Sequence, residues 1–424
     1  MKLNYKRTIL VGFAFFLICA FWQAYDTIIP LILTNKFAMT QTKSGIIMAL
    51  DNVFAVILLP IFGKISDRSS SNLGRRTPFI LVGTIVAAAA FAFIGLIDSQ
   101  SLFIGVLLVV LLAMSTFRSP AVALMPDVTV KPLRSKANAI INLMGTFGGM
   151  LVLVLASPFH TSEPGKTDFA SYIVTVCGIM LIALGVFLLT VKEKKWANEM
   201  EEDTKKYDCD EETKTRTEVG KLTKEQTVSL ILILASVALW YIGYNAVTSK
   251  YSVYASNVLG VSYSTTLLIA NAAAIVSYIP VGLIASKIGR KKTIIAGVVM
   301  LAVAFAAASF MNKGVSPIVM DIFFALAGIG WATINVNSFP MVVELAKAGD
   351  VGKYTGYYYA ASMAAQVITP IFSGFLMDKI SMRVLFPYAA VFVALAFVTM
   401  FFVSHGDSKP EMKQDMLENL DVGD

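Results

Sequence analysis

The sequence predicts an all-α membrane protein with twelve transmembrane helices, because twelve long apolar stretches alternate with polar segments along its 424 residues. A helix needs about 20 apolar residues to cross roughly 30 Å of hydrocarbon, and each stretch is near that length. Hydrophobic residues make up 56% of the chain and charged residues 15%, which suits contact with lipid. The stretches are too long and too uniformly apolar for barrel strands, so helices are expected.

One loop rich in both charge signs divides the predicted spans into six and six, and we expect it to be a solvated linker with helical edges. The predicted spans are Ile9–Leu33, Gly45–Phe62, Phe79–Ile97, Leu102–Met125, Ala139–Phe159, Tyr172–Val191, Val228–Val247, Thr265–Ile284, Thr293–Phe310, Ile318–Val343, Tyr354–Met377 and Val384–Val403. The expected parts are an N-terminal six-helix bundle (1–191), a cytoplasmic linker (192–226), a C-terminal six-helix bundle (227–404) and a cytoplasmic tail (405–424).

The distribution of basic residues predicts the topology. With a cytoplasmic N-terminus, 27 of the 35 Lys and Arg residues fall in cytoplasmic segments and 7 in outer loops, while Arg118 lies inside a span. This asymmetry follows the positive-inside rule and places both termini in the cytoplasm. The net charge of +7 is therefore a topology signal, and no nucleic-acid partner is expected.

Few residue types that serve metal, redox or catalytic chemistry are present. The chain has three cysteines and two histidines, and none has the spacing of a metal site. It has no GxxxxGK[ST] phosphate-binding loop. We expect no metal, no cofactor and no enzymatic activity; a membrane-embedded enzyme would need a catalytic cluster that the sequence does not show.

The two halves of the chain repeat each other. The segment from Gly63 to Arg76 follows the second span, and a similar segment from Gly282 to Lys292 follows the eighth. Asp127 precedes a lysine by nine residues after the fourth span, and Glu344 does so after the tenth. Duplicated halves around a midplane site are typical of secondary transporters, which work by alternating access.

These loops resemble the G-x-x-x-D-R-x-G-R-[RK] signature of the major facilitator superfamily, with five residues (69–73) in place of one in the first copy. Residues 67–80, 335–344 and 354–358 resemble the glycoside–cation symporters, especially the sucrose-transporter-like branch and its bacterial relatives. The resemblance implies the facilitator fold, transport of a sugar or glycoside, and residence in a bacterial cytoplasmic membrane.

Two departures from these relatives concern ion coupling. Val122 occupies the position of the arginine that plant sucrose carriers have after the proline of span four, and Arg118 lies one turn earlier. Ala55 and Leu59 occupy the positions of the acidic pair of melibiose-type sodium symporters. The second departure disfavours a sodium site of that kind, so a proton is the expected coupling ion, with uniport as the alternative.

Charged residues at the cytoplasmic ends of the spans are candidates for gating. A carboxylate at Asp67 can bond nearby arginines and cap the N-terminus of a neighbouring helix, and such contacts must break when the inner face opens. The alternative is that the basic residues only enforce topology. In the second copy Ser286 replaces the acid, which predicts a weaker contact there. The gating candidates are Asp67, Arg68, Arg75, Arg76, Asp127 and Glu344.

Polar and aromatic residues recur at helical spacing on several spans, which places each set on one side of its helix. Amides bond sugar hydroxyls and aromatic faces cover sugar C–H groups. The spans hold one arginine and no lysine well inside, so an uncharged or weakly charged substrate is favoured. The same stripes also join helices to one another in other proteins. The substrate-binding candidates are Trp22, Gln23, Asn142, Tyr241, Tyr244, Asn245, Trp331, Asn335, Tyr358 and Gln366.

Three ionisable residues within spans are candidates for proton coupling: Asp26, Asp51 and Arg118. A buried carboxylate can take up a proton near neutral pH, and a nearby arginine opposes this. The alternative is that both acids lie near the outer interface, remain hydrated and only cap or bridge helices.

We therefore predict a secondary active transporter that carries a sugar or glycoside with protons, by rocking two bundles about a central site. Its partners would be the neutral substrate, H+ and the lipid bilayer. The alternatives are a proton-coupled exporter of drugs or metabolites on the same fold, and a membrane-embedded sensor that does not transport.

Overall fold

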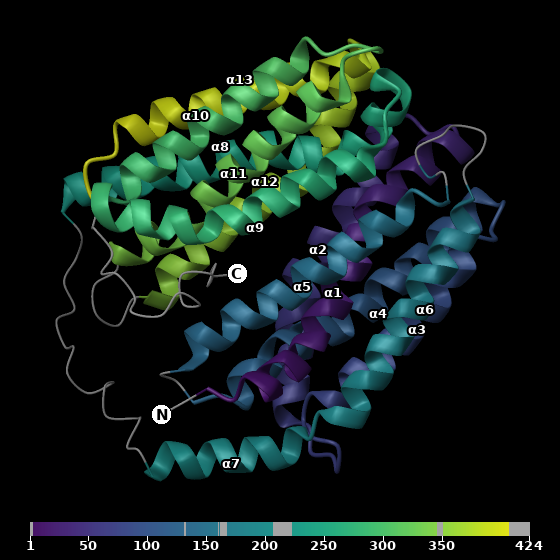
Figure 1. Cartoon of the computed structure of the whole chain (residues 1–424), viewed down its shortest axis with the longest axis vertical. Helices are drawn as coiled ribbons and strands as arrows, with labels where there is room; N and C mark the ends of the chain where they lie inside the picture. Colours follow the sequence, from purple (N-terminus) through teal and green to yellow (C-terminus); the bar gives the residue numbers. More distant parts are fainter. Residues whose placement is uncertain are drawn as a thin grey trace. The chain divides into compact units, whose positions relative to one another are not determined.

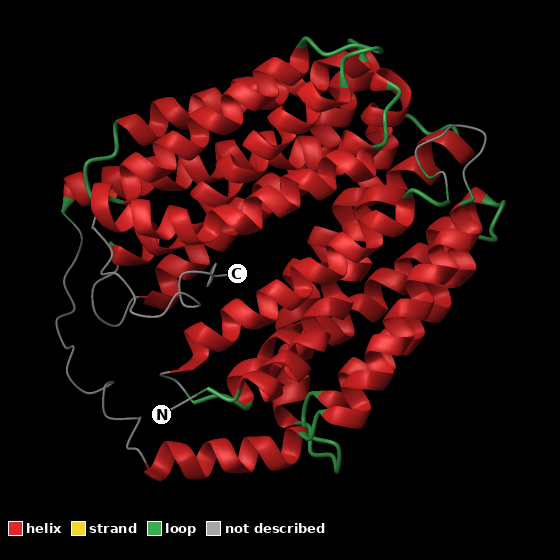
Figure 2. Cartoon of the chain, in the orientation of Figure 1, coloured by secondary structure: helices red, strands yellow, loops and turns green. Residues whose placement is uncertain are grey.

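The computed structural model describes residues 3–130, 133–159, 161, 168–206, 223–345 and 351–406. Within these residues the chain is helical and has no strand (Figure 2). Twelve of the described helices are long and apolar enough to cross a membrane, which confirms the predicted fold class. Residues 207–222 of the linker and 407–424 of the tail lie outside the described residues.

Figure 1 labels the helices in chain order. Those before the linker are α1 (Tyr5–Leu31), α2 (Gln41–Arg68), α3 (Thr77–Ile94), α4 (Gln100–Asp127), α5 (Arg134–Ala156), α6 (Phe169–Thr190) and α7 (Glu193–Lys206). Those after it are α8 (Lys224–Tyr254), α9 (Tyr263–Ile288), α10 (Arg290–Ser309), α11 (Pro317–Glu344), α12 (Val351–Lys379) and α13 (Leu385–Phe401), with the 3-10 turn η5 (Met382–Val384) between the last two. The helix α7 is the polar edge of the linker, and the others are the spans.

The described residues fall into two compact units. The first unit contains residues 3–29, 51–130, 133–159, 161 and 168–206, and the second contains 30–50, 223–345 and 351–406. The segment that joins α1 to α2 is therefore grouped with the second unit, so this division differs there from the six-plus-six division of the spans.

In the first unit, α3 packs against α4 and α6. Glycines bring α5 close to α1. A Cβ added at Gly148 would lie 2.7 Å from the carbonyl oxygen of Phe16, and one at Gly145 would lie 2.8 Å from Sγ of Cys19. Small residues let helix backbones approach closely in lipid, where packing replaces the hydrophobic effect as the main force between helices.

In the second unit, α9 and α10 both pack against α11, and α12 and α13 both pack against α8. α10 also contacts α13, which links the two groups. Gly297 and Gly330 face each other where α10 meets α11, since a Cβ at either would lie 2.9 Å from the carbonyl oxygen of the other. The fully buried Trp240 of α8 is the largest side chain enclosed in this packing.

The first helix of each half ends in the same way. α1 continues into the π-helical turn η1 (Ile32–Lys36), and α8 continues into the π-helical turn η4 (Ala255–Leu259). Asn257 Nδ2 of η4 donates to Asn35 Oδ1 of η1 at 3.3 Å. The duplication seen in the sequence therefore also includes the ends of α1 and α8.

The start of α2 lies backbone to backbone against α12. A Cβ at Gly45 would overlap the carbonyl of Pro370, and one at Gly374 would overlap the carbonyl of Gln41. Asp378 near the end of α12 accepts hydrogen bonds from the backbone N–H groups of Gln41 and Thr42, each at 2.7 Å. A carboxylate at a helix N-terminus satisfies backbone donors that have no partner within the helix.

Large apolar side chains cover the outer surfaces of the helices. Leu189 of α6 is 85% exposed, Val276 of α9 is 75% exposed and Ile318 of α11 is 70% exposed. A continuous apolar surface of this kind is not stable in water, whereas lipid tails are as apolar as these side chains. The exposed residues therefore agree with the membrane assignment made from the sequence.

The structure corrects one expectation about charge. We predicted that the seventh span ends at Val247 and that no lysine lies well inside a span, but α8 continues to Tyr254 and Lys250 is completely buried. Its Nζ donates to the carbonyl oxygen of Gln41 at 2.8 Å. A hydropathy average ends the predicted span before a lysine, because the ammonium group is polar. It takes no account of a carbonyl oxygen from another helix that can bind this group.

The glycine packing of α5 on α1 predicts the effect of a bulky residue. Gly148→Ile is expected to lower the stability of the protein by about 1–3 kcal/mol, because the new side chain must displace the Phe16 backbone. Gly178→Ile in α6 is the matched control, since nothing lies within 4 Å of a Cβ there. The measurement is the midpoint of thermal unfolding in detergent. Equal shifts for the two variants would contradict this account of the packing.

Candidate functional site

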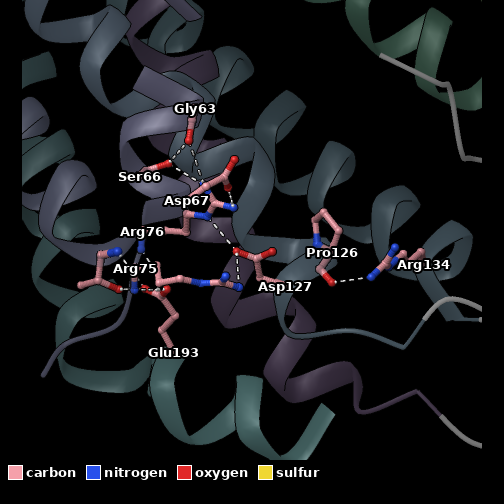
Figure 3. A network of polar contacts seen from close by, with 10 residues as sticks. Gly63, Ser66, Asp67, Arg75, Arg76, Pro126, Asp127, Arg134 and Glu193 are labelled. Carbon is pink, nitrogen blue, oxygen red and sulfur yellow. Dashed lines mark hydrogen bonds and ion pairs between the residues drawn. The ribbon is translucent and has the colours of Figure 1, made fainter. Parts of the chain in front are cut away.

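A buried arginine organises the polar ends of α2, α3 and α4 in the first unit (Figure 3). Arg76, 4% exposed, donates from Nε to Asp127 Oδ2 at 2.7 Å and from Nη2 to Asp67 Oδ1 at 2.5 Å. Its Nη1 donates to Ser66 Oγ. Arg75 adds a longer ion pair with Asp127, at 3.6 Å. Side chains from α2 and α4 thus meet at one guanidinium at the start of α3.

The pairing compensates for the burial of the charge. Burial lowers the pKa of the Arg76 guanidinium, but hydrogen bonds and charge interactions with Asp127 and Asp67 outweigh it and raise the pKa above its ordinary value. Arg76 therefore remains charged. A buried guanidinium that loses a carboxylate partner is strongly destabilised, so α2, α3 and α4 are held together at these ends.

A second carboxylate, which the sequence analysis did not select, caps α3. Glu193, the first residue of α7 and 3% exposed, accepts from the backbone N–H of Arg75 at 2.6 Å and from that of Arg76 at 2.8 Å. Its other oxygen accepts from the backbone N–H and the hydroxyl of Thr77, at 2.8 and 2.7 Å. Gly74, at φ 118°, turns the chain so that these donors converge.

Glu193 corrects the role expected for Asp67. We predicted that Asp67 would bond arginines and cap a neighbouring helix; it does bond Arg76, whereas Glu193 caps α3. The signal in the sequence was an acidic residue directly after a span, but its partners lie more than a hundred residues earlier. Arg68, another gating candidate, is exposed and has no ion pair with a described residue.

The second unit also has an arginine–carboxylate pair at the corresponding helix ends. Arg290 Nε at the start of α10 donates to Glu344 Oε1 at the end of α11, at 2.6 Å. Gly289 precedes it at φ 96°, as Gly74 precedes Arg75 in the first unit. The acids that the sequence repeats, Asp127 and Glu344, thus both bind an arginine at the start of the preceding helix.

The coupling candidates lie together in the first unit. Asp26 of α1 interacts electrostatically with Asp51 of α2 and with Arg118 of α4. The Arg118 guanidinium carbon is 5.4 Å from the centroid of the Trp22 ring. Asp51 also accepts hydrogen bonds from the backbone and side-chain nitrogens of Asn52, at 2.6 and 2.7 Å. Two acids and one arginine from three different helices therefore share one electrostatic environment.

The other candidates of the first unit lie near this group. Trp22 contacts Tyr25 edge to face, with ring centroids 5.2 Å apart, and its Nε1 is buried with no hydrogen-bond partner among the described residues. The side chain of Gln23 lies beside Gly149 of α5. Asn142 is also on α5, and its backbone carbonyl oxygen accepts a hydrogen bond from the Thr146 hydroxyl at 3.0 Å. α1 and α5 therefore both carry candidate residues where they pack together.

The candidates of the second unit form an aromatic cluster. The rings of Tyr244 on α8 and Trp331 on α11 are stacked, with centroids 3.6 Å apart and an interplanar angle of 3°. Tyr241 meets Trp331 edge to face at 5.2 Å and interacts through its hydroxyl with Tyr358 of α12. The Tyr358 hydroxyl also bonds Ser338 Oγ at 3.0 Å. The cluster thus joins α8, α11 and α12.

Amide groups accompany this aromatic cluster. Asn245 follows Tyr244 directly, and its Nδ2 is buried without a hydrogen-bond partner among the described residues. Asn335 of α11 lies one turn after Trp331, and Gln366 of α12 lies two turns after Tyr358; both are half-buried. Neither amide side chain is hydrogen-bonded to another described residue. A buried amide without a partner is costly, so such groups mark positions where a ligand or water can bind.

Comparison with known proteins identifies the family. A family model described as the Major Facilitator Superfamily matches residues 11–348 and 267–418. The chain belongs to the major facilitator superfamily. Over 134 residues, 31% of this chain, it is 26% identical to the MFS-type transporter ppzB of Metarhizium rileyi (strain RCEF 4871), and the match covers 27% of that relative.

Solved structures of facilitator proteins share the fold over nearly the whole chain. The inward-open structure of the xylose transporter XylE from E. coli has a TM-score of 0.69 at 16% identity, covering 98% of this chain and 99% of that one. A point mutant of the nucleoside transporter NupG has a TM-score of 0.68 at 12% identity, covering 93% and 99%. The family and fold are those of transporters rather than enzymes.

The position of Glu193 in this facilitator protein predicts that its charge stabilises the start of α3 and the attachment of α7. Glu193→Gln keeps the shape of the side chain but weakens hydrogen bonds to backbone N–H groups; charged bonds of this kind contribute about 1.5–3 kcal/mol each. The variant should unfold at lower temperature and be cleaved faster by protease in the linker.

The matched control for this prediction is Glu201→Gln, which removes an exposed carboxylate from the same helix. If Glu193→Gln and Glu201→Gln had the same unfolding temperature and the same rate of cleavage, the capping role of Glu193 would be wrong.

Proposed function

We propose that this facilitator protein is a secondary transporter for a neutral, hydroxyl-rich solute, a sugar or glycoside, which it carries together with protons. The observation that carries the proposal is the Tyr244–Trp331 stack, together with Asn245, the next residue of α8, whose buried Nδ2 has no hydrogen-bond partner among the described residues. Small-molecule sites are mostly apolar and aromatic, with a few polar groups that fix the orientation of the ligand.

The chemistry of this cluster suits a sugar. The face of an aromatic ring covers the C–H groups of a sugar ring, while an amide offers both donors and an acceptor to its hydroxyls. Asn245, Asn335 and Gln366 each have such an amide on the helices that carry the aromatic rings. An apolar drug would leave these amides without partners, which disfavours the exporter alternative.

The charged groups within the spans also favour a neutral substrate. Lys250 binds the Gln41 carbonyl, and Arg118 interacts with Asp26 and Asp51. These two cations thus already have an acceptor or an acidic partner in their own unit. An anionic substrate such as a phosphate ester would need a cation that is not engaged in this way.

The solved structures of similar fold are consistent with a sugar substrate, but they do not distinguish it from other substrates. XylE carries xylose and NupG carries a nucleoside, and both substrates contain a hydroxyl-rich sugar ring. The fold also occurs in a bacterial homologue of drug peptide transporters. The preference for a sugar therefore comes from the residues of this chain.

Proton coupling is proposed from the group formed by Asp26, Asp51 and Arg118. An acid that shares its environment with another acid and with an arginine changes its proton affinity when either neighbour moves. Alternation of the transporter between two states would supply that movement. We further propose that the protein resides in a bacterial cytoplasmic membrane with both termini in the cytoplasm, as the distribution of basic residues predicts.

Uptake into vesicles tests the substrate. The wild-type protein should accumulate one or more radiolabelled neutral glycosides, and Trp331→Ala should lower uptake efficiency about tenfold or more, which corresponds to about 1.4 kcal/mol. Phe310→Ala, which removes an aromatic ring that is 83% exposed at the end of α10, is the matched control and should leave uptake unchanged. Uptake of drugs but of no glycoside would support the exporter instead.

Coupling is tested separately at Asp51. Asp51→Asn should bind substrate and exchange it across the membrane, but it should no longer accumulate it against a gradient, because the side chain cannot exchange a proton. Asp98→Asn, which changes an acid outside the spans, should retain accumulation. Concentrative uptake by Asp51→Asn at the wild-type level, or wild-type accumulation that a protonophore does not reduce, would contradict the coupling role.

A further inference from the structure

A groove on the second unit lies outside the aromatic cluster and is unused by the proposed transport cycle. It has a volume of about 750 Å³ and is formed by α9, α10 and α11. Its floor is made by Ile329 and Thr333 of α11, and alanines of α9 and α10 line its walls. We call it the α9–α10 groove. Its volume falls within the roughly 300–1,000 Å³ that is typical of small-molecule sites.

The groove follows from how these helices pack. α9 and α10 each pack closely on α11 but contact each other little, which leaves a furrow between them. Ala273 and Ala296 are too small to fill this furrow. Val276 and Ile284, which also line it, are 75% and 47% exposed, so the groove opens onto the apolar outer surface of the spans. A hydrocarbon chain from the bilayer can therefore enter it.

Two lysines lie about one helical turn beyond lining residues of this groove. Lys287 lies three residues after Ile284 on α9, and Lys292 lies four residues before Ala296 on α10. These spacings place each lysine on the face of its helix that lines the groove. Both lysines are exposed. Lysine side chains at the ends of spans extend along apolar surface to reach the headgroup region.

The neighbouring basic residues are engaged elsewhere. Arg290 is paired with Glu344, and Lys291 donates to the carbonyl oxygens of Phe401 and Val403, at 2.9 and 2.6 Å. Lys287 and Lys292, in contrast, have no ion pair with any residue that the structure describes. Lys287 and Lys292 therefore lie near the α9–α10 groove, and neither is paired with an acid in the described part of the chain.

We propose that the α9–α10 groove binds an anionic phospholipid, with one acyl chain along Ala273 and Ala296 and the phosphate between Lys287 and Lys292. The apolar lining would contact the acyl chain, and the two lysines would bind the negative headgroup. A zwitterionic lipid has the same chains but no net charge, so it binds more weakly. Basic pockets between spans on the cytoplasmic side are a known way of recognising acidic lipids.

The test is titration of the delipidated full-length protein in detergent with dioleoyl phosphatidylglycerol or dioleoyl phosphatidylcholine, followed by native mass spectrometry. The wild-type protein should bind phosphatidylglycerol about 25-fold more tightly than phosphatidylcholine. The double variant Lys287→Gln/Lys292→Gln should lose about fivefold in phosphatidylglycerol affinity for each lysine and bind the two lipids alike. Ala296→Phe, which fills the groove, should weaken binding of both lipids.

Matched controls locate the effect. Lys192→Gln/Lys194→Gln removes two exposed lysines at α7, and Ala89→Phe enlarges an exposed alanine on α3; neither should change lipid affinity. Equal affinity of the wild type for both lipids, unchanged affinity in the Lys287/Lys292 variant, or an equal loss in the α7 control would overturn the proposal. Unchanged binding by Ala296→Phe would overturn the placement of the chain in the groove.

Discussion

Lipid offers no hydrogen bonds to a protein backbone, and this constraint determines where polar chemistry can occur in this chain. The spans satisfy their own backbone groups, so unsatisfied donors remain only at their ends. Carboxylates accordingly bind such donors at helix ends: Glu193 binds the N–H groups at the start of α3, and Asp378 binds those at the start of α2. Arg76 is buried at the same end as Glu193 and requires acids from two further helices. Carboxylates thus do at these ends what main-chain hydrogen bonds do within the spans.

The two halves repeat geometry more faithfully than chemistry. In both, a glycine at positive φ and an arginine stand where α3 or α10 begins, and an acid from the next helix binds that arginine. The first half adds Asp67 and Glu193, whereas the second has Ser286 at the position of the signature acid. The two halves also end their first helices in π-helical turns that meet at Asn35 and Asn257. Duplication therefore preserved how the chain turns, while the side chains that secure each turn diverged.

Hydropathy alone predicted the twelve spans, because one physical property, contact with lipid, governs about 20 successive residues at a time. Helical spacing placed Tyr244 and Trp331 each on a face of its own helix, but it could not predict that the two rings stack, because spacing says nothing of the neighbouring helix. Glu193 was missed for a similar reason: its partners are distant in the sequence. Lys250 was misplaced because its carbonyl acceptor belongs to another helix. Sequence patterns report what a residue needs locally, whereas these contacts depend on tertiary structure.

The crossing of α2 and α12 has a mechanical consequence. At Gly45 and Gly374 the contact is formed by main-chain atoms, so no side chains interdigitate there. A side chain larger than glycine at either position would push the two helices apart. The directional bonds of Asp378 to Gln41 and Thr42 add a polar attachment beside this contact. The crossing therefore combines main-chain contact at two glycines with one carboxylate that binds the start of α2.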